Sequence, residues 1–467
     1  MTGTLRFETT GHLGRQARNL VVSSLLCALG ACGGLPGLDT PAPPVGPPFL
    51  VGGPVSGLRG TDLEVSNLAD STSSNIVIVA GSASFNLPPV FNPGDGYDLI
   101  IAHQPAQPAQ FCVIKNGQGV VGSADVLNVS ISCSNVASRF LFVGGSNGVA
   151  SYGIDESTGR LTSNASLALT AGPHYVGVDP YNKFLFVADA AANQILGFAI
   201  NSTSGSLNVL PTSPYAVGAR PDFLGFRVRP SIGVNLYAAN QLDDTLSDLA
   251  IDQASGALTP ESGSPFAAGS QPVSIAATLN PAFLVLDGGA NSIYAFGLSG
   301  ATAFALPGSP YATGKLPVAQ VLDSSGRFLY VANRGDDTVS GFRVAYDGSL
   351  TSMSASPFFT GHLPAAIAID PYSRFAYVIN AGDSTISAYR IDSASGNLVA
   401  IPGSPFGAGG SPMAAQIDSL GKFLWVSYGA TNGISGFSVD QISGALAPIA
   451  GSTVPTVSAP ASLALGN

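Results

Sequence analysis

Short apolar runs separated by Gly/Asp/Asn turns recur about every 47 residues from Arg139 to the C-terminus. The clearest copies are KFLFVADAAANQILGFAI from Lys183, RFLYVANRGDDTVSGFRV from Arg327 and RFAYVINAGDSTISAYRI from Arg374. Looser copies start at Arg139, Gly233, Ala282 and Lys422. Each run has the length and the Val/Ile/Phe/Tyr content of a β-strand. A fixed repeat of this kind predicts an all-β fold, a β-propeller with one blade per repeat.

Each repeat predicts four strands, which we name A to D in chain order. Strand A begins with a proline, B is the RFLYVAN-like run, C is the TVSGFRV-like run, and D follows an SG-x-L turn and ends in GSPF or GSPY. The A-strand prolines are Pro173, Pro221, Pro272, Pro317, Pro364, Pro412 and Pro460. The run at Arg139 has no A strand directly before it, and the run at Pro460 has no B strand after it. We therefore predict that residues 137–467 form seven four-stranded blades, with the C-terminal strand closing the ring so that no sheet edge is left unpaired.

The N-terminus has the features of an export signal. Arg15 and Arg18 precede the apolar stretch from Leu20 to Ala31, which is too short to span a bilayer as a helix. The sequence Leu29-Gly30-Ala31-Cys32 resembles the lipobox of bacterial lipoproteins. That resemblance implies a signal peptide of residues 1–31, removed before Cys32, and a lipid on the Cys32 sulfur. An ordinary signal peptide followed by an incidental cysteine is the alternative.

This interpretation places the protein in a bacterial cell envelope, either periplasmic or at the outer membrane or cell surface, and attached to the membrane through Cys32. Residues 32–48 are rich in Gly and Pro and predict a semi-rigid tether. Short apolar runs in residues 49–135 predict a small antiparallel β-sandwich that resembles immunoglobulin-like or carboxypeptidase-regulatory-like modules. Its Cys112 and Cys133 are expected to form a disulfide, as two cysteines of an exported protein most simply do. The alternative, a metal pair, lacks a nearby histidine or second cysteine pair.

Composition narrows the function classes. Only 10% of residues are charged and the formal net charge is −10, without a basic stripe, which argues against nucleic acid as a partner. The 45% hydrophobic content is ample for a core, and the 57 Gly and 34 Pro fall between the apolar runs, where turns are needed. We expect a monomer. Glu and His are too sparse for a zinc site, and we expect neither a metal nor a cofactor.

Strand direction alternates within a blade, so the D–A and B–C loops lie on one face of the ring. The polar residues expected there from the D–A side are His174, Arg220, Asp222, Gln271, Lys315 and His362. Those from the B–C side are Asp189, Asn240, Gln241, Asp287, Asn333, Arg334, Asn380 and Asp383. For the Asn and Asp residues that follow the B strands, capping of a turn is the competing interpretation. Similarly, Arg334 could pair with Asp336 or Asp337, and the histidines could be held by backbone groups.

The repeats resemble the lactonase-like seven-bladed propellers, which include bacterial 6-phosphogluconolactonases, carboxymuconate cycloisomerases and YVTN-type proteins. The resemblance is carried by PHYVGVDPYNKFLFVADAAANQILGF from Pro173 and by the SG-x-L and GSPF elements. Cycloisomerases of this family use a channel histidine, which His174 matches, and a Glu after a neighbouring B strand, where this chain has Asn240. Arg220 lies near the position of an arginine that the family uses to bind substrate carboxylates. In the blade after that of Asn240, the residue that follows the B strand is Asp287.

These observations leave three functions. The first is an interaction platform that binds a protein, a glycan or a small anion through Asn240, Lys315, Arg334 and His362. The alternative is a divergent lactonase or cycloisomerase that uses His174, Arg220 and Asp222, without the G-x-S-x-G motif of a serine nucleophile. A purely structural surface component is the third.

Overall fold

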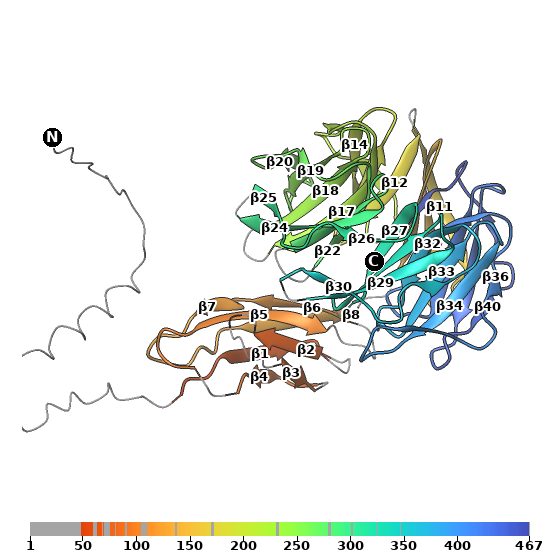
Figure 1. The fold of residues 1–467 in the computed structure, drawn as a ribbon. Helices are drawn as coiled ribbons and strands as arrows, with labels where there is room; N and C mark the ends of the chain where they lie inside the picture. The colour runs from red at the N-terminus through yellow and green to blue at the C-terminus, as the bar shows by residue number, and fades with distance from the viewer. Residues whose placement is uncertain are drawn as a thin grey trace, which may run out of the picture. The chain divides into compact units, whose positions relative to one another are not determined.

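The computed structural model describes residues 48–466 apart from short gaps at 59–62, 68, 70–74, 80, 89–90, 104–109, 136–137, 170–171, 230–232, 279–281, 300–301, 325 and 346. The predicted signal peptide, Cys32 and the tether up to residue 47 lie outside the described residues. Everything described is strand, turn or irregular loop (Figure 1). In this part of the chain, no helix has the length and apolarity needed to cross a membrane.

Residues 49–135 form two four-stranded sheets around one core. One sheet has the order β4 (Ser84–Asn86), β1 (Gly52–Ser56), β8 (Ser130–Asn135), β6 (Gln110–Lys115). The other has the order β3 (Asn75–Ile78), β2 (Leu63–Asn67), β5 (Gly96–His103), β7 (Gln118–Val120). Val55 and Ile131 of the first sheet pack in the same cluster as Val65 and Leu99 of the second. One detail differs from the predicted antiparallel arrangement: β1 and β8 run parallel, because the first and last strands of this unit lie side by side.

The predicted disulfide is present. Cys112 of β6 and Cys133 of β8 are directly opposite each other in an antiparallel pair and are joined through their sulfur atoms. Cys112 is buried in the core of this unit, so the disulfide joins β6 to β8 from inside the core. The disulfide that the number of cysteines predicted is therefore confirmed.

The rest of the described chain forms seven blades (Figure 1). Blade 1 comprises β42 (Ser462–Gly466), β9 (Phe140–Gly145), β10 (Gly148–Ile154) and β11 (Leu161–Ala168). Blade 2 comprises β12 (Pro173–Val178), β13 (Phe184–Asp189), β14 (Gln194–Ile200), β15 (Leu207–Val209) and β16 (Tyr215–Ala216). Blade 3 comprises β17 (Pro221–Arg229), β18 (Gly233–Asn240), β19 (Thr245–Ile251), β20 (Leu258–Pro260) and β21 (Phe266–Ala267). Blade 4 comprises β22 (Pro272–Ala277), β23 (Ala282–Asp287), β24 (Ser292–Ser299), β25 (Thr302–Ala305) and β26 (Tyr311–Ala312). Blade 5 comprises β27 (Pro317–Leu322), β28 (Phe328–Asn333), β29 (Thr338–Val344), β30 (Leu350–Ser352) and β31 (Phe358–Phe359). Blade 6 comprises β32 (Pro364–Ile369), β33 (Phe375–Asn380), β34 (Thr385–Ile391), β35 (Leu398–Ala400) and β36 (Phe406–Gly407). Blade 7 comprises β37 (Pro412–Ile417), β38 (Phe423–Tyr428), β39 (Gly433–Val439), β40 (Leu446–Pro448) and β41 (Val454–Pro455).

The ring is closed as predicted. Strand β42 pairs antiparallel with β9, with Leu463 opposite Val143, and so supplies the A strand of blade 1. Each A strand contacts the A strands of both neighbouring blades, in the circuit β12, β17, β22, β27, β32, β37, β42 and back to β12. The predicted all-β, seven-bladed fold is therefore confirmed.

The B strands explain why the repeat is so apolar. Every residue of β13, β28, β33 and β38 is buried. In β33, Tyr377 and Ile379 pack against blade 7, while Ala376 and Val378 pack against blade 5. Because both faces of a blade are covered by neighbours, its second strand is a continuous hydrophobic run and does not alternate with polar residues.

The D strands differ from the prediction, because six of the seven are split into two short pieces. In blades 2 to 6 the break falls at a Ser-Pro pair, and proline has no N–H to donate to the ladder. The serine side chain pairs a backbone donor of the neighbouring C strand at this break. For example, Ser356 Oγ accepts a 3.0 Å hydrogen bond from Gly341 N–H of the C strand. The GSPF motif is thus a device for ending a strand without leaving a buried donor unpaired.

Candidate functional site

The A strands begin on the face formed by the D–A and B–C loops, which we call the proline face. The residue before the A-strand proline has a positive φ in blades 3 to 7, as in Arg220 (φ 53°) and Leu363 (φ 52°). This backbone is held by the B–C turn of the preceding blade. Arg220 N–H donates to Asn193 Oδ1 at 2.9 Å, and Leu363 N–H donates to Asp337 Oδ1 at 2.9 Å. The loops of the proline face are therefore tied from blade to blade.

The Asn residues at the ends of three B strands are hydrogen-bonded within their own blades. Asn240 is fully buried, and its Nδ2 donates at 3.0 Å to both Thr245 Oγ1 and Ser247 Oγ. Asn333 and Asn380 make the same pair of bonds in blades 5 and 6. The geometry thus favours the capping interpretation over ligand binding by Asn240. A buried amide in this position also leaves the cycloisomerase mechanism without its acid.

Arg220 and Asp222 come together at the start of β17. Arg220 Nε lies 3.2 Å from Asp222 Oδ2, and the side chains are 47% and 17% exposed. Asp222 occupies a bulge, since Pro221 pairs with Asn240 and the next paired residue is Phe223. Its Oδ1 is buried and, among the described residues, has no hydrogen-bond partner. Such a carboxylate oxygen is costly unless a water or a ligand satisfies it.

Stability does not explain this pair. An ion pair with a half-exposed arginine is worth only about 0.2–1 kcal/mol. The equivalent positions in blades 4 to 7, which have the same bulge after the A-strand proline, hold apolar side chains: Val273, Val318, Ala365 and Met413. The charged residue therefore departs from the repeat at one sector of the proline face, which is the pattern expected of a functional position.

His174 holds the equivalent position in blade 2, because β12 has the same bulge between Pro173 and Tyr175. Its side chain lies outside the described part of the structure. The residues that follow the two bulges do meet, with the rings of Tyr175 and Phe223 4.3 Å apart between centroids. Hence His174 and Asp222 start neighbouring strands at the same end. Burial raises the pKa of Tyr175 to about 12, so its phenol stays neutral.

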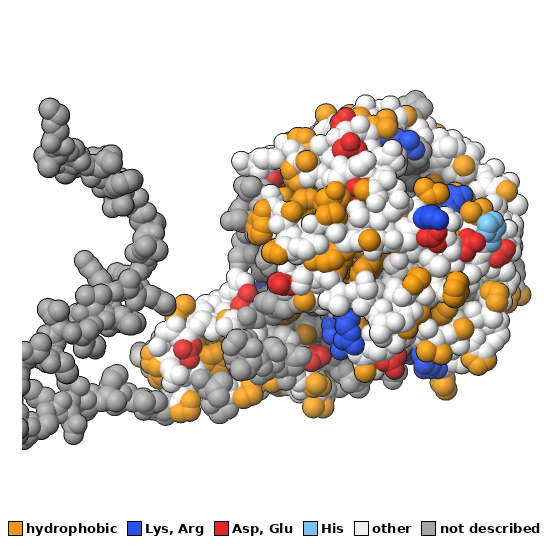
Figure 2. All heavy atoms as spheres, in the orientation of Figure 1, with side chains coloured by type: hydrophobic (Ala, Val, Ile, Leu, Met, Phe, Trp, Pro, Cys, Tyr) orange, Lys and Arg blue, Asp and Glu red, His pale blue; other side chains and the backbone are white. Residues whose placement is uncertain are grey.

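The other predicted ligand residues are engaged within blades 5 and 6. Lys315 Nζ lies 3.7 Å from Asp336 Oδ1, and His362 Nδ1 lies 3.0 Å from Asp337 Oδ2. The hydrogen bond and charge of Asp337 raise the pKa of His362 above its usual value, and His362 lowers the pKa of Asp337. Histidine, acidic and basic side chains gather on the surface in the area where Figure 1 labels β32 and β33 (Figure 2). Among the described residues, Arg334 has no ion pair with Asp336 or Asp337, and its backbone N–H donates to Leu316 O.

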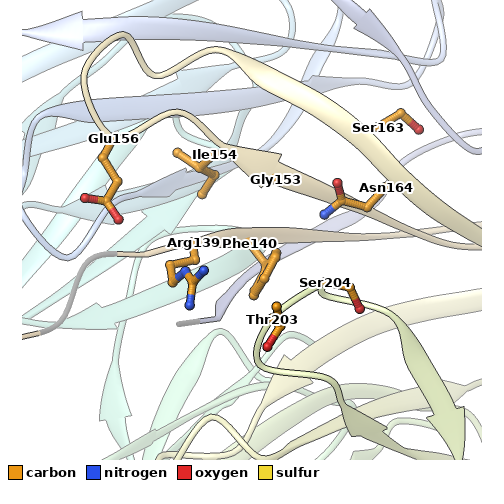
Figure 3. A pocket seen from close by; sticks show the side chains of 9 residues that line it. All are labelled: Arg139, Phe140, Gly153, Ile154, Glu156, Ser163, Asn164, Thr203 and Ser204. Carbon is orange, nitrogen blue, oxygen red and sulfur yellow. The ribbon is translucent and has the colours of Figure 1, made fainter.

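Sequence reasoning missed two features. It gave no special role to the buried aspartates that end four A strands, such as Asp323, whose Oδ1 accepts hydrogen bonds from the N–H groups of Arg327 and Phe328. The available signal was an aspartate four residues before the Arg or Lys of four of the five RF or KF pairs. It also missed an open pocket of about 610 Å³ between blades 1 and 2, away from the proline face, which Figure 3 shows. Within the described residues, no three His, Cys, Asp or Glu side chains form a group that could hold a metal ion.

Comparison with known proteins agrees with this fold. Residues 299–398 and 351–461 match the profile of the family Lactonase, 7-bladed beta-propeller. A candidate 6-phosphogluconolactonase of Bacteroides fragilis has 22% identity and a TM-score of 0.62, covering 71% of this chain and 98% of that one. A periplasmic gluconolactonase of Pseudomonas aeruginosa has 18% identity and a TM-score of 0.59, covering 70% and 99%. A Lactobacillus plantarum protein has 21% identity and a TM-score of 0.60, covering 71% and 100%.

No curated protein matches the chain in sequence. The solved structures are below 25% identity, so they establish the fold and leave the reaction open. The family profile favours the lactonase alternative over the interaction platform. The described chain from Phe140 onwards is a seven-bladed β-propeller, and residues 299–461 of it match the lactonase propeller profile.

Proposed function

We propose that the protein hydrolyses lactones at the start of β12 and β17, with Asp222, Arg220 and His174 at the site. The observation that carries this proposal is the Asp222 carboxylate, with Oδ2 held by Arg220 and Oδ1 buried and unpartnered among the described residues. This oxygen is a carboxylate oxygen without a donor among the described residues, so it can accept a proton. The match of residues 299–461 to the lactonase profile supports the choice of reaction.

In the proposed reaction, Asp222 Oδ1 accepts a proton from a water whose oxygen bonds to the lactone carbonyl carbon. The carbonyl oxygen takes up negative charge, which the Arg220 guanidinium stabilises. Collapse of this intermediate breaks the ring carbon–oxygen bond, and the departing alkoxide takes a proton to give the open-chain hydroxy acid. His174, at the same position of the neighbouring strand, is the group assigned to deliver that proton.

Replacing Asp222 by Asn is expected to lower kcat/KM for glucono-δ-lactone by about 10²–10⁴-fold, the usual contribution of a general base. The neutral amide keeps the shape of the side chain but cannot take a proton from water. The measurement is release of acid by the purified full chain, corrected for spontaneous opening, with 6-phosphogluconolactone as a second substrate to test phosphate recognition.

Asp336→Asn is the matched control, because it removes an acid of the same face that is paired with Lys315. Its turnover should equal that of the unchanged protein. Circular dichroism melts establish that each variant is folded. The proposal is rejected if the unchanged protein opens neither lactone faster than buffer does, or if Asp222→Asn retains full activity.

We also propose that the protein is attached to the bacterial envelope by a lipid on Cys32. The support is the lipobox-like sequence Leu29-Gly30-Ala31-Cys32 and the disulfide between Cys112 and Cys133, which suits an oxidising compartment outside the cytoplasm. More than one acyl chain is needed for stable anchoring, as bacterial lipoproteins have.

In bacterial cells fed an alkyne-tagged palmitate, the chain is expected to carry the label and to sediment with membranes. Cys32→Ser should remove the label and release the protein, whereas Cys27→Ser, inside the predicted signal peptide, should leave both unchanged. A label that persists in Cys32→Ser would disprove the anchor.

A further inference from the structure

The pocket between blades 1 and 2 has a polar lining. Its walls include Arg139, Glu156, Ser163, Asn164, Thr203 and Ser204. Figure 3 shows Arg139 and Phe140 between the turn and D strand of blade 1, which carry Glu156 and Asn164, and the C–D turn of blade 2, which carries Thr203 and Ser204. A volume of about 610 Å³ is within the range of small-molecule sites. The polar lining is unlike that of sites for apolar ligands.

Blades 5 and 6 have arginine side chains in the corresponding space. In blade 5, two arginines cover the ring of Phe328: Arg327 at 5.1 Å and Arg343 at 5.5 Å from its centroid. They donate to two successive carbonyls of the C–D turn in blade 6, those of Ser393 and Ala394. Blade 6 repeats this arrangement toward blade 7. There Arg374 and Arg390 cover Phe375 and donate to the carbonyls of Gln441 and Ile442.

Blade 1 keeps only the first arginine of this pair. Arg139 lies over Phe140 at 5.7 Å and donates to Ser202 O at 3.2 Å, as Arg327 and Arg374 do in their blades. The second arginine is replaced by Gly153, which lies opposite Phe140 just as Arg343 lies opposite Phe328. The pocket therefore includes the space that the second arginine occupies in blades 5 and 6, and Thr203 corresponds to the residue whose carbonyl accepts from that arginine.

The outer wall of the pocket also departs from the repeat. Blade 1 has an unbroken D strand of eight residues, β11, and its register shifts between Ser151 and Tyr152. That shift leaves Asn164 as an extra residue, and its amide lies over Gly153, with Oδ1 3.3 Å from where a Cβ would be. The missing arginine and the added asparagine thus occur at the same point of the ring.

We infer that this pocket binds a neutral hydroxylated ring, such as one sugar unit of a saccharide. Arg139 and Glu156 contribute one positive and one negative charge, so the site favours a ligand without net charge. The guanidinium offers several N–H donors, the carboxylate accepts from adjacent hydroxyls, and Asn164 and the serine and threonine hydroxyls can do both. A ligand that carries hydrogen-bond donors and acceptors around its whole edge matches these side chains. The inference is independent of the proposed lactonase site, which lies on the proline face.

The test is saturation-transfer difference NMR of the purified full chain with glucose, galactose and N-acetylglucosamine as probes. Transfer to at least one sugar is expected, and Gly153→Arg should abolish it because it restores the side chain that fills this space in blades 5 and 6. Asn164→Ala should weaken the transfer. Ala199→Arg, the same change at the equivalent position of blade 2, is the matched control and should leave it unchanged.

Melting curves establish that Gly153→Arg and Ala199→Arg are folded, and lactone turnover should be the same in both as in the unchanged protein. Absence of transfer to all three sugars would overturn the inference, as would full transfer in folded Gly153→Arg. Loss of transfer in Asp222→Asn would also overturn it, since the sugars would then be bound at the proline face. Failure of the lactonase proposal alone would leave the transfer intact.

Discussion

Truncation after Ala459 is expected to unfold the propeller, although it removes only eight residues. The loss takes away β42, the A strand of blade 1, and leaves β9 with an unpaired edge. Leu463 is buried against blade 7 and Ala464 against blade 2, so both interfaces of blade 1 lose part of their core. Ser462 Oγ also accepts a 2.9 Å hydrogen bond from Val176 N–H of blade 2.

The expected loss in the free energy of unfolding is of the order of the total stability of the propeller. Removal of one buried leucine costs about 2–5 kcal/mol, and native domains have only about 5–15 kcal/mol in total. The measurement is urea unfolding followed by circular dichroism and by the fluorescence of the single tryptophan, Trp425, which lies in the blade 7–blade 1 core. Truncation after Gly466 keeps β42 and should unfold like the full chain. A truncated chain with an unchanged transition would show that the ring does not depend on its closing strand.

The sequence predicts the propeller well because its repeat marks every blade with residues of fixed physical roles. The A-strand prolines return in all seven blades and the RF or KF pairs in five of them, at the same register, so the offset between Arg139 and Pro460 reveals the closing strand. The N-terminal unit has no repeat. Its strand spacing indicates two sheets, but the parallel pairing of β1 with β8 depends on contacts between its first and last strands, which spacing does not encode.

The candidate site was predicted in part. Placing Arg220 and Asp222 on one face required only the blade phase, and the structure brings them to 3.2 Å. Asn240 belongs to the same loops by sequence but is buried, because the B-strand end lies beneath the turn that it caps. The pocket of blade 1 could not be found from its own residues. It becomes visible only when the arginines of blades 5 and 6 show what Gly153 replaces.

Trp425→Ala is expected to destabilise the propeller by about 3–5 kcal/mol, the usual cost of deleting a large buried aromatic side chain. Trp425 is fully buried in β38, and its Nε1–H donates to Gly159 O at 3.1 Å. The same link occurs in two other blades, where Tyr330 donates to Gly396 O and Tyr377 donates to Gly444 O. Each joins a B strand to the C–D turn of the following blade.

These equivalents provide a matched control. Trp425→Tyr places in blade 7 the residue that blades 5 and 6 use for the same bond, and its cost should stay below about 1.5 kcal/mol, as for swaps that keep the packing. Both variants are compared by urea unfolding with circular dichroism, because the substitution removes the tryptophan signal. If Trp425→Tyr destabilises the propeller as much as Trp425→Ala does, the hydrogen bond to Gly159 O does not account for the stabilising effect of the aromatic side chain. The interface of blades 7 and 1, where the ring closes, would then depend on the volume of the indole alone.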